Sequence, residues 1–202
     1  MKLYYAPGAC SMAPHIMLHE LGKKFSIEKV DLGEHKTADG KDFMKVNRKG
    51  YVPTLELKKD EVLTEVSTIL QYLADKSKST KFLPKFGTMN RYRSMETLNF
   101  IASELHKGIG SLFNPAMPAE GKDTIKLRVA KRLAYVDGLL AKQKFIAGKS
   151  FSVADAYAFT VISWCNNVGI DLSIYKHISK YLAAVAKRPA VQAAMKAEGL
   201  LG

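Results

Sequence analysis

The sequence predicts a two-domain fold in which a mixed α/β domain is followed by an all-helical domain. Short strand-like runs alternate with helical runs up to residue 75, whereas from residue 88 onward only helical periodicity is found. Between them lies a stretch rich in lysine and serine that contains Pro84 and Gly87, residue types typical of a linker. We therefore expect domains at residues 1–80 and 88–202.

The first domain is expected to begin with a βαβ unit. Residues 2–6 predict a strand, residues 11–21 a helix that ends at Gly22, and residues 25–32 a second strand with period-two alternation. This order implies that the two strands pair in parallel through a right-handed crossover.

A β-hairpin and a helix are predicted to complete this domain. Residues 52–57 and 61–65 predict strands separated by a turn at 58–60, and residues 67–76 predict a helix. A Rossmann half is disfavoured because no GxGxxG motif follows the first strand. The order βαβ, loop, ββα instead favours a thioredoxin-like domain.

The second domain is expected to be a helical bundle with helices at residues 88–113, 123–143, 153–168, 174–187 and 190–198. Ser152 is a candidate N-cap, and Asp155 follows at the spacing of a capping box. Phe151 and Ala156 stand at the positions of a hydrophobic staple. The pattern gives this segment a structural role rather than a catalytic one.

Composition excludes several classes of protein. With 202 residues, 47% apolar and 25% charged, and no run near the roughly 18 apolar residues of a membrane span, the chain is typical of a cytoplasmic globular protein. Two cysteines are too few for a disulfide framework and favour a reducing compartment. The net charge of +12 is spread evenly and lacks a nucleic-acid-binding pattern, so we expect no nucleic-acid or membrane partner, while an acidic small substrate stays compatible.

Cys10 stands where the first strand-like run gives way to a helix. Pro14 is tolerated only in a first helical turn, so the helix should begin near Cys10 or Ser11. There the thiol would face unpaired backbone amides and the positive end of the helix dipole, which favour the thiolate. A small buried filler is the alternative. Since no second cysteine lies three residues away, a lone thiol needs a partner from solution, and glutathione suits it best.

Five segments together resemble bacterial beta-class glutathione S-transferases, in order and spacing, from residue 1 to residue 200. They are MKLYYAPGACS, NRKGYVPTLEL, LTE followed by QYLAD, ETLNFIASELHKG and FSVADAYAF. The resemblance implies a thioredoxin-like domain, a helical domain and a homodimer with one glutathione site per subunit between the domains.

The resemblance also implies roles for residues of the first domain. Cys10 matches the family's active-site cysteine, which can form a mixed disulfide with glutathione, and Tyr5 matches a tyrosine that is not the main thiol activator. Val52 would pair through its backbone with the cysteinyl part of glutathione, before a cis-proline at Pro53. Glu65 matches the acid that holds the γ-glutamyl group.

Two positions depart from the family pattern. Many relatives have serine or glycine where this chain has Val66. The hydroxyl contact to the γ-glutamyl carboxylate is therefore lost unless Ser67 supplies it. A backbone amide at the helix start still offers a site for this anion. His35 stands where relatives often have a lysine for the glycyl carboxylate, and Lys36 could compensate. Both changes bear on glutathione affinity.

In the predicted helix 88–113, Asn99, Ser103 and His106 share one face. The neighbouring apolar stripe, expected to face the core, comprises Leu98, Ile101, Leu105 and Ile109. From the residues alone, His106 is as readily a solvated or structurally bonded histidine as a functional one. The resemblance implies that His106 lies near the glutathione sulfur and that Asn99 and Ser103 contact the ligand.

Other candidates are weaker. The resemblance implies that Glu104 reaches glutathione bound by the other subunit, while Lys107 and Trp164 are candidates for the electrophile pocket. Trp164 could equally be a core aromatic. No metal site is expected, because His15 and His19 share a helix face without an evident third ligand; the two are interpreted as surface or packing residues, and Cys165 as a buried filler.

The sequence therefore predicts an enzyme that uses glutathione as co-substrate and transfers it to an electrophilic carbon of a small hydrophobic compound. Because Cys10 would lie close to the glutathione sulfur, reduction of disulfides or peroxides is an alternative activity. A binder that sequesters hydrophobic compounds without catalysis is the alternative from another class.

Overall fold

The computed structural model describes residues 1–59, 61–77 and 79–201, and the chain forms two compact units. The first comprises Met1–Lys78 together with Arg188–Gly202, and the second comprises Ser79–Lys187. Within the described parts of the chain, no helix is both long enough and apolar enough to cross a bilayer.

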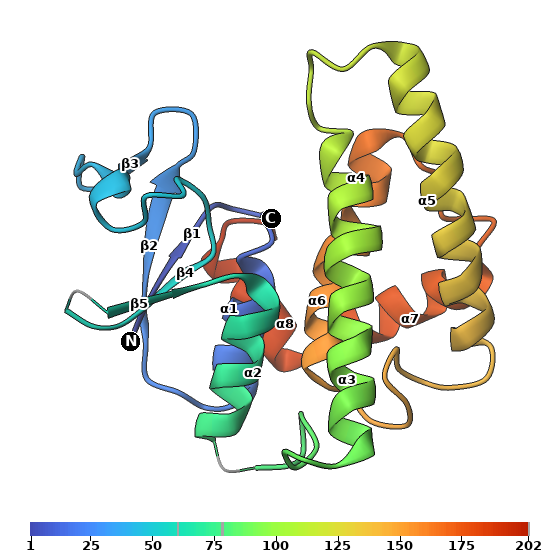
Figure 1. Cartoon of the computed structure of the whole chain (residues 1–202), viewed down its shortest axis with the longest axis horizontal. Helices are drawn as coiled ribbons and strands as arrows, with labels where there is room; N and C mark the ends of the chain where they lie inside the picture. The colour runs from blue at the N-terminus through green and yellow to red at the C-terminus, as the bar shows by residue number, and fades with distance from the viewer. Residues whose placement is uncertain (60, 78, 202) are drawn as a thin grey trace. The chain divides into compact units, whose positions relative to one another are not determined.

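The first unit contains a mixed five-stranded sheet of order β3-β2-β1-β4-β5 (Figure 1). The strands are β1 (Lys2–Tyr5), β2 (Ser26–Asp31), β3 (Lys36–Thr37), β4 (Thr54–Lys58) and β5 (Glu61–Thr64). β1 pairs in parallel with β2 and antiparallel with β4, and β4 pairs antiparallel with β5. The predicted βαβ unit and hairpin are confirmed. The predicted turn at 58–60 includes residue 60, which lies outside the described residues.

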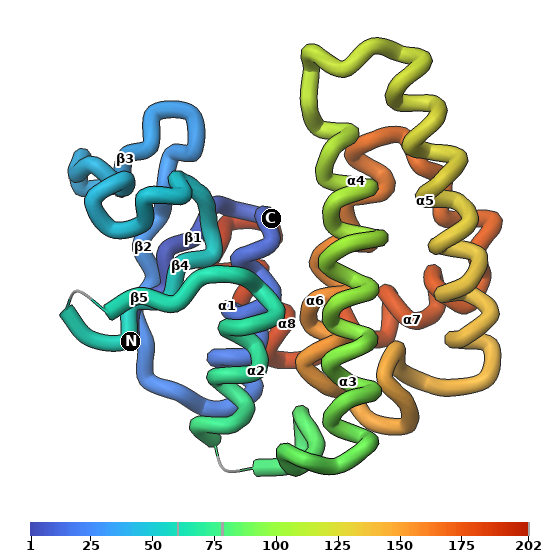
Figure 2. Tube along the Cα trace, in the orientation of Figure 1, coloured from blue at the N-terminus to red at the C-terminus, as the bar shows by residue number. Residues whose placement is uncertain are grey.

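Helices cover one side of this sheet. α1 (Met12–Glu20) packs against both α2 (Val66–Lys76) and α8 (Pro189–Ala197). Figure 2 shows the C-terminal α8, in red, running beside α1, in blue. α1 buries seven consecutive residues, Met12 to Leu18, because both neighbours pack on it.

A separate apolar cluster supports the segment that leads to Cys10. It consists of Tyr4, Val30, Phe43 and Val52, with Ala6 and Ala9 packed against it. Phe43 belongs to a short 3-10 helix, Phe43–Lys45, that the sequence did not predict. Tyr4 of β1, Val52 in the segment before β4 and the loop containing Ala9 therefore share one apolar support.

The C-terminal helix departs from the expected division of the chain. We expected residues 88–202 to form the helical domain, but Arg188–Gly202 groups with the first unit. Two polar contacts explain this: His15 Nδ1 lies 2.8 Å from Glu198 Oε1, and Arg188 Nε donates to Glu20 Oε1 at 2.6 Å. Neither pairing has a local sequence signal, because each joins residues more than 160 positions apart.

The second unit is helical, as predicted. Its elements are α3 (Met89–Phe100), a π-helical segment (Ile101–His106), α4 (Lys107–Ser111), α5 (Ala119–Leu140), α6 (Val153–Ile162), a 3-10 segment (Ser163–Val168) and α7 (Lys176–Ala186). All ten residues of α6 are buried, so α6 is the core helix of this unit. The apolar stripe of Leu98, Ile101, Leu105 and Ile109 is buried as expected.

The predicted capping box at the start of α6 is present. The Asp155 carboxylate accepts hydrogen bonds from the Ser152 backbone N–H at 2.8 Å and from the Ser152 hydroxyl at 2.7 Å. It also accepts from the Ile146 N–H at 2.8 Å and from the Tyr181 hydroxyl at 3.2 Å. Burial raises the pKa of Asp155 to about 6, although these hydrogen bonds oppose the shift. One side chain therefore joins the preceding loop, α6 and α7.

We expect Asp155→Asn to lower the free energy of unfolding by about 3 kcal/mol, because a buried, fourfold-bonded carboxylate loses acceptors. Ser152→Ala is the matched control, with an expected loss of about 1 kcal/mol. Urea denaturation followed by circular dichroism measures both. Equal losses for the two variants would contradict the central role of Asp155.

The raised pKa of Asp155 predicts that the stability of the protein depends on pH. The folded pKa of about 6 exceeds the ordinary value of 3.8, so between these values the folded state keeps a proton that the unfolded state has lost. Stability contributed by Asp155 is therefore present at low pH and lost as pH rises to 6. The deficit of Asp155→Asn relative to wild type should be larger near pH ~4 than near pH ~8; the opposite trend would contradict the raised pKa.

Candidate functional site

The loop between β1 and α1 presents Cys10. The Ser11 hydroxyl bonds to both the carbonyl and the N–H of Ala6, each at 3.3 Å, which closes the loop. Gly8 has a φ of +70°, a left-handed conformation that favours glycine. α1 begins at Met12, so Cys10 lies immediately before the N-cap Ser11. The predicted helix start is confirmed.

The environment of the Cys10 sulfur differs in part from the expectation. The N–H groups of Met12 and Ala13 are not unpaired, because they donate to the carbonyls of Ala9 and Cys10 at 3.0 and 3.2 Å. The Cys10 thiol instead donates to the Val52 carbonyl at 3.3 Å. This bond requires a protonated sulfur, since a thiolate has no hydrogen to donate. Cys10 itself is half-buried.

The Val52–Pro53 peptide bond is cis, as the family resemblance implied. The Val52 carbonyl lies beside the thiol, and Val52 itself is buried in the apolar cluster. Tyr5, at the end of β1, is also buried and packs with its ring centroid 6.1 Å from that of His15. Burial raises the pKa of Tyr5, which does not favour an ionised phenol.

A buried carboxylate that the sequence analysis missed holds the cysteine loop. Glu198 accepts from the Gly8 N–H through Oε2 at 2.9 Å and contacts His15 Nδ1 through Oε1 at 2.8 Å. The side chains of His15 and Glu198 are 1% and 0% exposed. His15 also stacks on His19 at 5.1 Å, so these two histidines are packing residues and His15 is not at the surface.

We expect Glu198→Ala to lower the free energy of unfolding by about 3 kcal/mol, because it leaves the Gly8 N–H and His15 without their buried partner. Loosening of the loop should also raise the rate at which iodoacetamide alkylates Cys10. Arg188→Ala on the same helix is the control, since its more exposed ion pair with Glu20 should contribute about 1 kcal/mol or less. Unchanged alkylation with Glu198→Ala would contradict a role for Glu198 in holding the loop.

A polar cluster surrounds Glu65. Glu65 directly precedes α2 with a φ of +69°, an uncommon conformation for a residue with a side chain. Lys49 Nζ and the Tyr51 hydroxyl contact Glu65 Oε1 at 2.8 and 2.7 Å. The hydrogen bond to Glu65 raises the pKa of both Lys49 and Tyr51. Lys49 and Tyr51 bind the same oxygen of Glu65 and so orient its carboxylate. The sequence analysis assigned neither residue a role.

The two departures from the family pattern have distinct surroundings. Val66 is the first residue of α2 and is buried, so it offers the helix-start backbone but not a polar side chain. His35 has a φ of +53°, and its buried Nδ1 has no hydrogen-bond partner among the described residues. Lys36, expected to compensate for His35, pairs with Glu34 at 3.0 Å.

In the second unit, His106 is part of an aromatic group. Its Nδ1 lies 2.6 Å from the Tyr157 hydroxyl, and its ring centroid lies 5.1 Å from that of Trp164. Trp164 is 8% exposed, and the exposed Phe113 packs on it at 6.0 Å. Tyr157 lies within the segment FSVADAYAF, and the sequence assigns it no role because it stands 51 positions from His106.

The predicted shared face of Asn99, Ser103 and His106 holds only in part. The Ser103 hydroxyl donates to the Asn99 carbonyl at 2.9 Å, and Asn99, Ser103 and Lys107 are exposed, whereas His106 is half-buried. Ser103 and His106 belong to a π-helical segment, Ile101–His106, whose turns are wider than those of an α-helix. π-Turns within helices occur frequently at functional sites.

Glu104 is held within its own unit. Arg132 Nε donates to Glu104 Oε2 at 2.6 Å, and Arg128 lies 3.7 Å from Oε1. The hydrogen bond from Arg132 holds the pKa of Glu104 below its usual value. Cys165 is fully buried, and burial raises its pKa to about 12, in agreement with a filler role.

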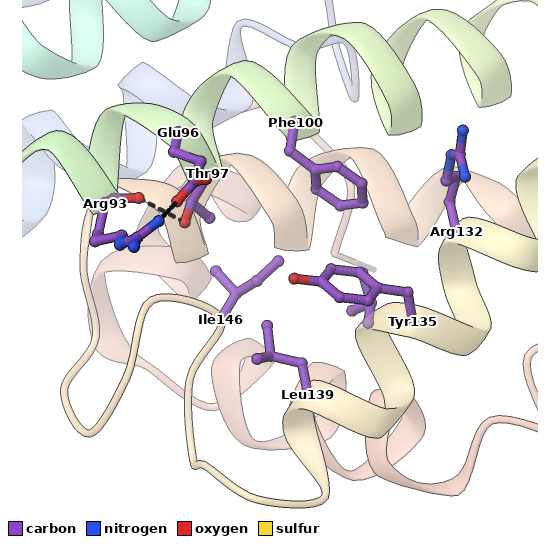
Figure 3. A pocket seen from close by; sticks show the side chains of 9 residues that line it. Arg93, Glu96, Thr97, Phe100, Arg132, Tyr135, Leu139 and Ile146 are labelled. Atoms are coloured by element: carbon purple, nitrogen blue, oxygen red, sulfur yellow. Dashed lines mark hydrogen bonds and ion pairs between the residues drawn. The ribbon is translucent and has the colours of Figure 1, made fainter.

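A cavity of about 510 Å³ lies in the second unit between α3 and α5. Its lining includes no predicted site residue and comprises Arg93, Glu96, Thr97, Phe100, Arg132, Tyr135, Val136, Leu139 and Ile146. Figure 3 shows the Tyr135 hydroxyl pointing towards Ile146. The rings of Phe100 and Tyr135 pack edge to face at 5.5 Å.

The sequence matches two family models. Residues 8–76 match the glutathione S-transferase N-terminal domain, and residues 100–189 match the glutathione S-transferase C-terminal domain. The chain is 44% identical over 200 residues to glutathione S-transferase GstA of Escherichia coli O157:H7, which covers 99% of this chain and 100% of that protein.

Solved structures give the same result. A sphingomonad glutathione S-transferase complexed with glutathione is similar at 46% identity and a TM-score of 0.95, covering 99% of this chain and 100% of that one. A beta-class glutathione S-transferase of Sphingomonas chungbukensis is similar at 44% identity and a TM-score of 0.96, covering 100% of both chains. This chain therefore belongs to the glutathione S-transferase family and groups with its beta class.

Proposed function

We propose that this protein transfers the glutathione thiolate to electrophilic carbons of small hydrophobic compounds. The observation that carries the proposal is Cys10 at 3.3 Å from the Val52 carbonyl, beside a cis Val52–Pro53 bond, in a chain of the beta class. The sphingomonad relative, whose structure contains glutathione, supports glutathione as the co-substrate.

Residues of the first unit would bind the tripeptide. The backbone of Val52 pairs with its cysteinyl part, and the Glu65 carboxylate, oriented by Lys49 and Tyr51, attracts its ammonium group. The start of α2 at Val66 receives the γ-glutamyl carboxylate. His35 stands at the position that would serve the glycyl carboxylate.

Residues of the second unit would act on the sulfur and the electrophile. His106 donates a hydrogen bond to the glutathione thiolate, which lowers the cost of ionisation. The sulfur then forms a bond to carbon while the leaving group, such as chloride, departs with the bonding electrons and the thiol proton passes to solvent. Asn99 and Ser103 contact glutathione, and Lys107 and the buried Trp164 line the electrophile side.

A redox activity is the second candidate, because Cys10 is a half-buried free cysteine. Its thiolate would attack a glutathione mixed disulfide and release the other thiol, forming a disulfide between Cys10 and glutathione. A second glutathione would then release oxidised glutathione and restore Cys10. A protein that binds glutathione but catalyses neither reaction would instead be a binder of hydrophobic compounds. The cytoplasm, a reducing compartment, suits either enzyme.

We expect Cys10→Ala to abolish the glutathione adduct seen by intact-protein mass spectrometry after incubation with oxidised glutathione. Conjugation of a chlorinated nitroaromatic should fall by less than about tenfold, because glutathione itself supplies the attacking sulfur. Cys165→Ala is the control and should keep both properties. Complete loss of conjugation in Cys10→Ala would show that Cys10 is the essential group of the transferase reaction.

We also place a second copy of the chain on the face formed by α3 and α5. Tyr135 on α5 lines the α3–α5 cavity and is exposed, and Met89 and Tyr92 on α3 and Leu127 on α5 are further exposed apolar residues of these two helices. Contiguous exposed apolar surface marks interaction sites. In such a homodimer, Glu104 would reach glutathione bound by the other subunit while Arg132 holds its carboxylate.

Tyr135→Glu should shift the protein from dimer to monomer in sedimentation velocity, because a carboxylate cannot be buried unpaired at low cost. Ile174→Glu places the same charge on an exposed apolar residue outside this face and should leave the dimer intact. A monomeric wild type, or a dimer unaffected by Tyr135→Glu, would contradict the assignment of this face.

A further inference from the structure

The second unit holds the His106 ring from several sides. Tyr157 reaches Nδ1 with its hydroxyl, and its ring also lies edge-on to the imidazole at a centroid distance of 5.7 Å. Trp164 packs against the imidazole at an interplanar angle of 65°. Gly110 adjoins the ring, since a Cβ there would lie 3.5 Å from His106 Cδ2. The imidazole is therefore kept in one orientation by packing and by a hydrogen bond.

The Tyr157 hydroxyl bears on which nitrogen of His106 carries hydrogen. A phenol carries a hydrogen that it can donate, whereas a neutral imidazole has one protonated and one bare nitrogen. When the phenol donates to Nδ1, the imidazole hydrogen is at Nε2, on the other side of the ring. At 2.6 Å the contact between the hydroxyl and Nδ1 is short for a hydrogen bond.

We propose that Tyr157 is a positioning residue for His106: its hydroxyl donates to Nδ1 and so presents an Nε2–H donor to the glutathione thiolate. This inference rests on the proposed function, which places His106 near that sulfur. Tyr157 acts through His106 and need not touch glutathione itself.

The burial of Tyr157 and its place on α6 suit a positioning role. Tyr157 is 2% exposed and belongs to α6, all of whose residues are buried. Asp155, two residues earlier, bonds α6 to the preceding loop and to Tyr181 of α7. The hydroxyl that meets His106 is thus carried by a core helix, whereas His106 ends the π-helical segment. A rigid donor on a core helix can hold a ring on a less regular one.

Tyr157→Phe removes one oxygen and keeps the ring. We expect kcat for conjugation of the chlorinated nitroaromatic to fall about tenfold, with the KM for glutathione changed by less than about twofold. Tyr175→Phe is the matched control, because this buried tyrosine of the same unit donates its hydroxyl to the Ala130 carbonyl instead. It should lose stability without losing kcat.

Nitrogen-15 NMR of the His106 ring provides a readout that a purely structural role would not move. Wild type should show the Nε2–H tautomer, and Tyr157→Phe should show a mixture of tautomers. An Nδ1–H tautomer in wild type, or an unchanged kcat in Tyr157→Phe, would overturn the inference. The wild-type spectrum decides this even if Tyr157→Phe does not fold. Failure of the proposed function is distinguishable, since wild type would then show no conjugation whatever its tautomer.

Discussion

The cysteine loop depends on one buried carboxylate. Glu198 accepts from the Gly8 N–H and contacts His15, and so ties the loop before α1 to α8 at the far end of the chain. A buried carboxylate is costly unless its oxygens are bonded, and here both oxygens have partners. The position of Cys10 is thus determined by a residue nearly 190 positions later, and this is also why α8 groups with the first unit.

The Cys10 thiol uses a carbonyl that glutathione would also need. Its thiol donates to the Val52 carbonyl, and the first amides of α1 are already taken by local turns, so the loop does not by itself present a bare thiolate. Glutathione pairing with the Val52 backbone would compete for the same carbonyl. Under the proposed function, glutathione binding would therefore release the Cys10 thiol from this bond, and the transferase and redox activities would share this carbonyl.

In the second unit, α6 carries both the Asp155 anchor and the tyrosine that contacts His106. Asp155 anchors the start of this helix through four hydrogen bonds, and Tyr157, one half-turn later, contacts His106. The capping box was interpreted from sequence as purely structural. Because α6 is buried along its whole length, the same anchoring also sets where the Tyr157 hydroxyl stands. The capping box and the tyrosine that contacts His106 thus share one buried helix.

The sequence alone determined the order of strands and helices, the buried stripe of α3 and the π segment, the capping box and Cys10 at the start of α1. These follow from periodicity and from local residue preferences, which act within a few positions of the chain. Only the tertiary structure decided the partners of Glu198, Glu65 and His106, the π-helical turn and the bond from Cys10 to Val52. Each of these depends on long-range packing, which brings polar groups from distant positions together because buried polar atoms must find partners.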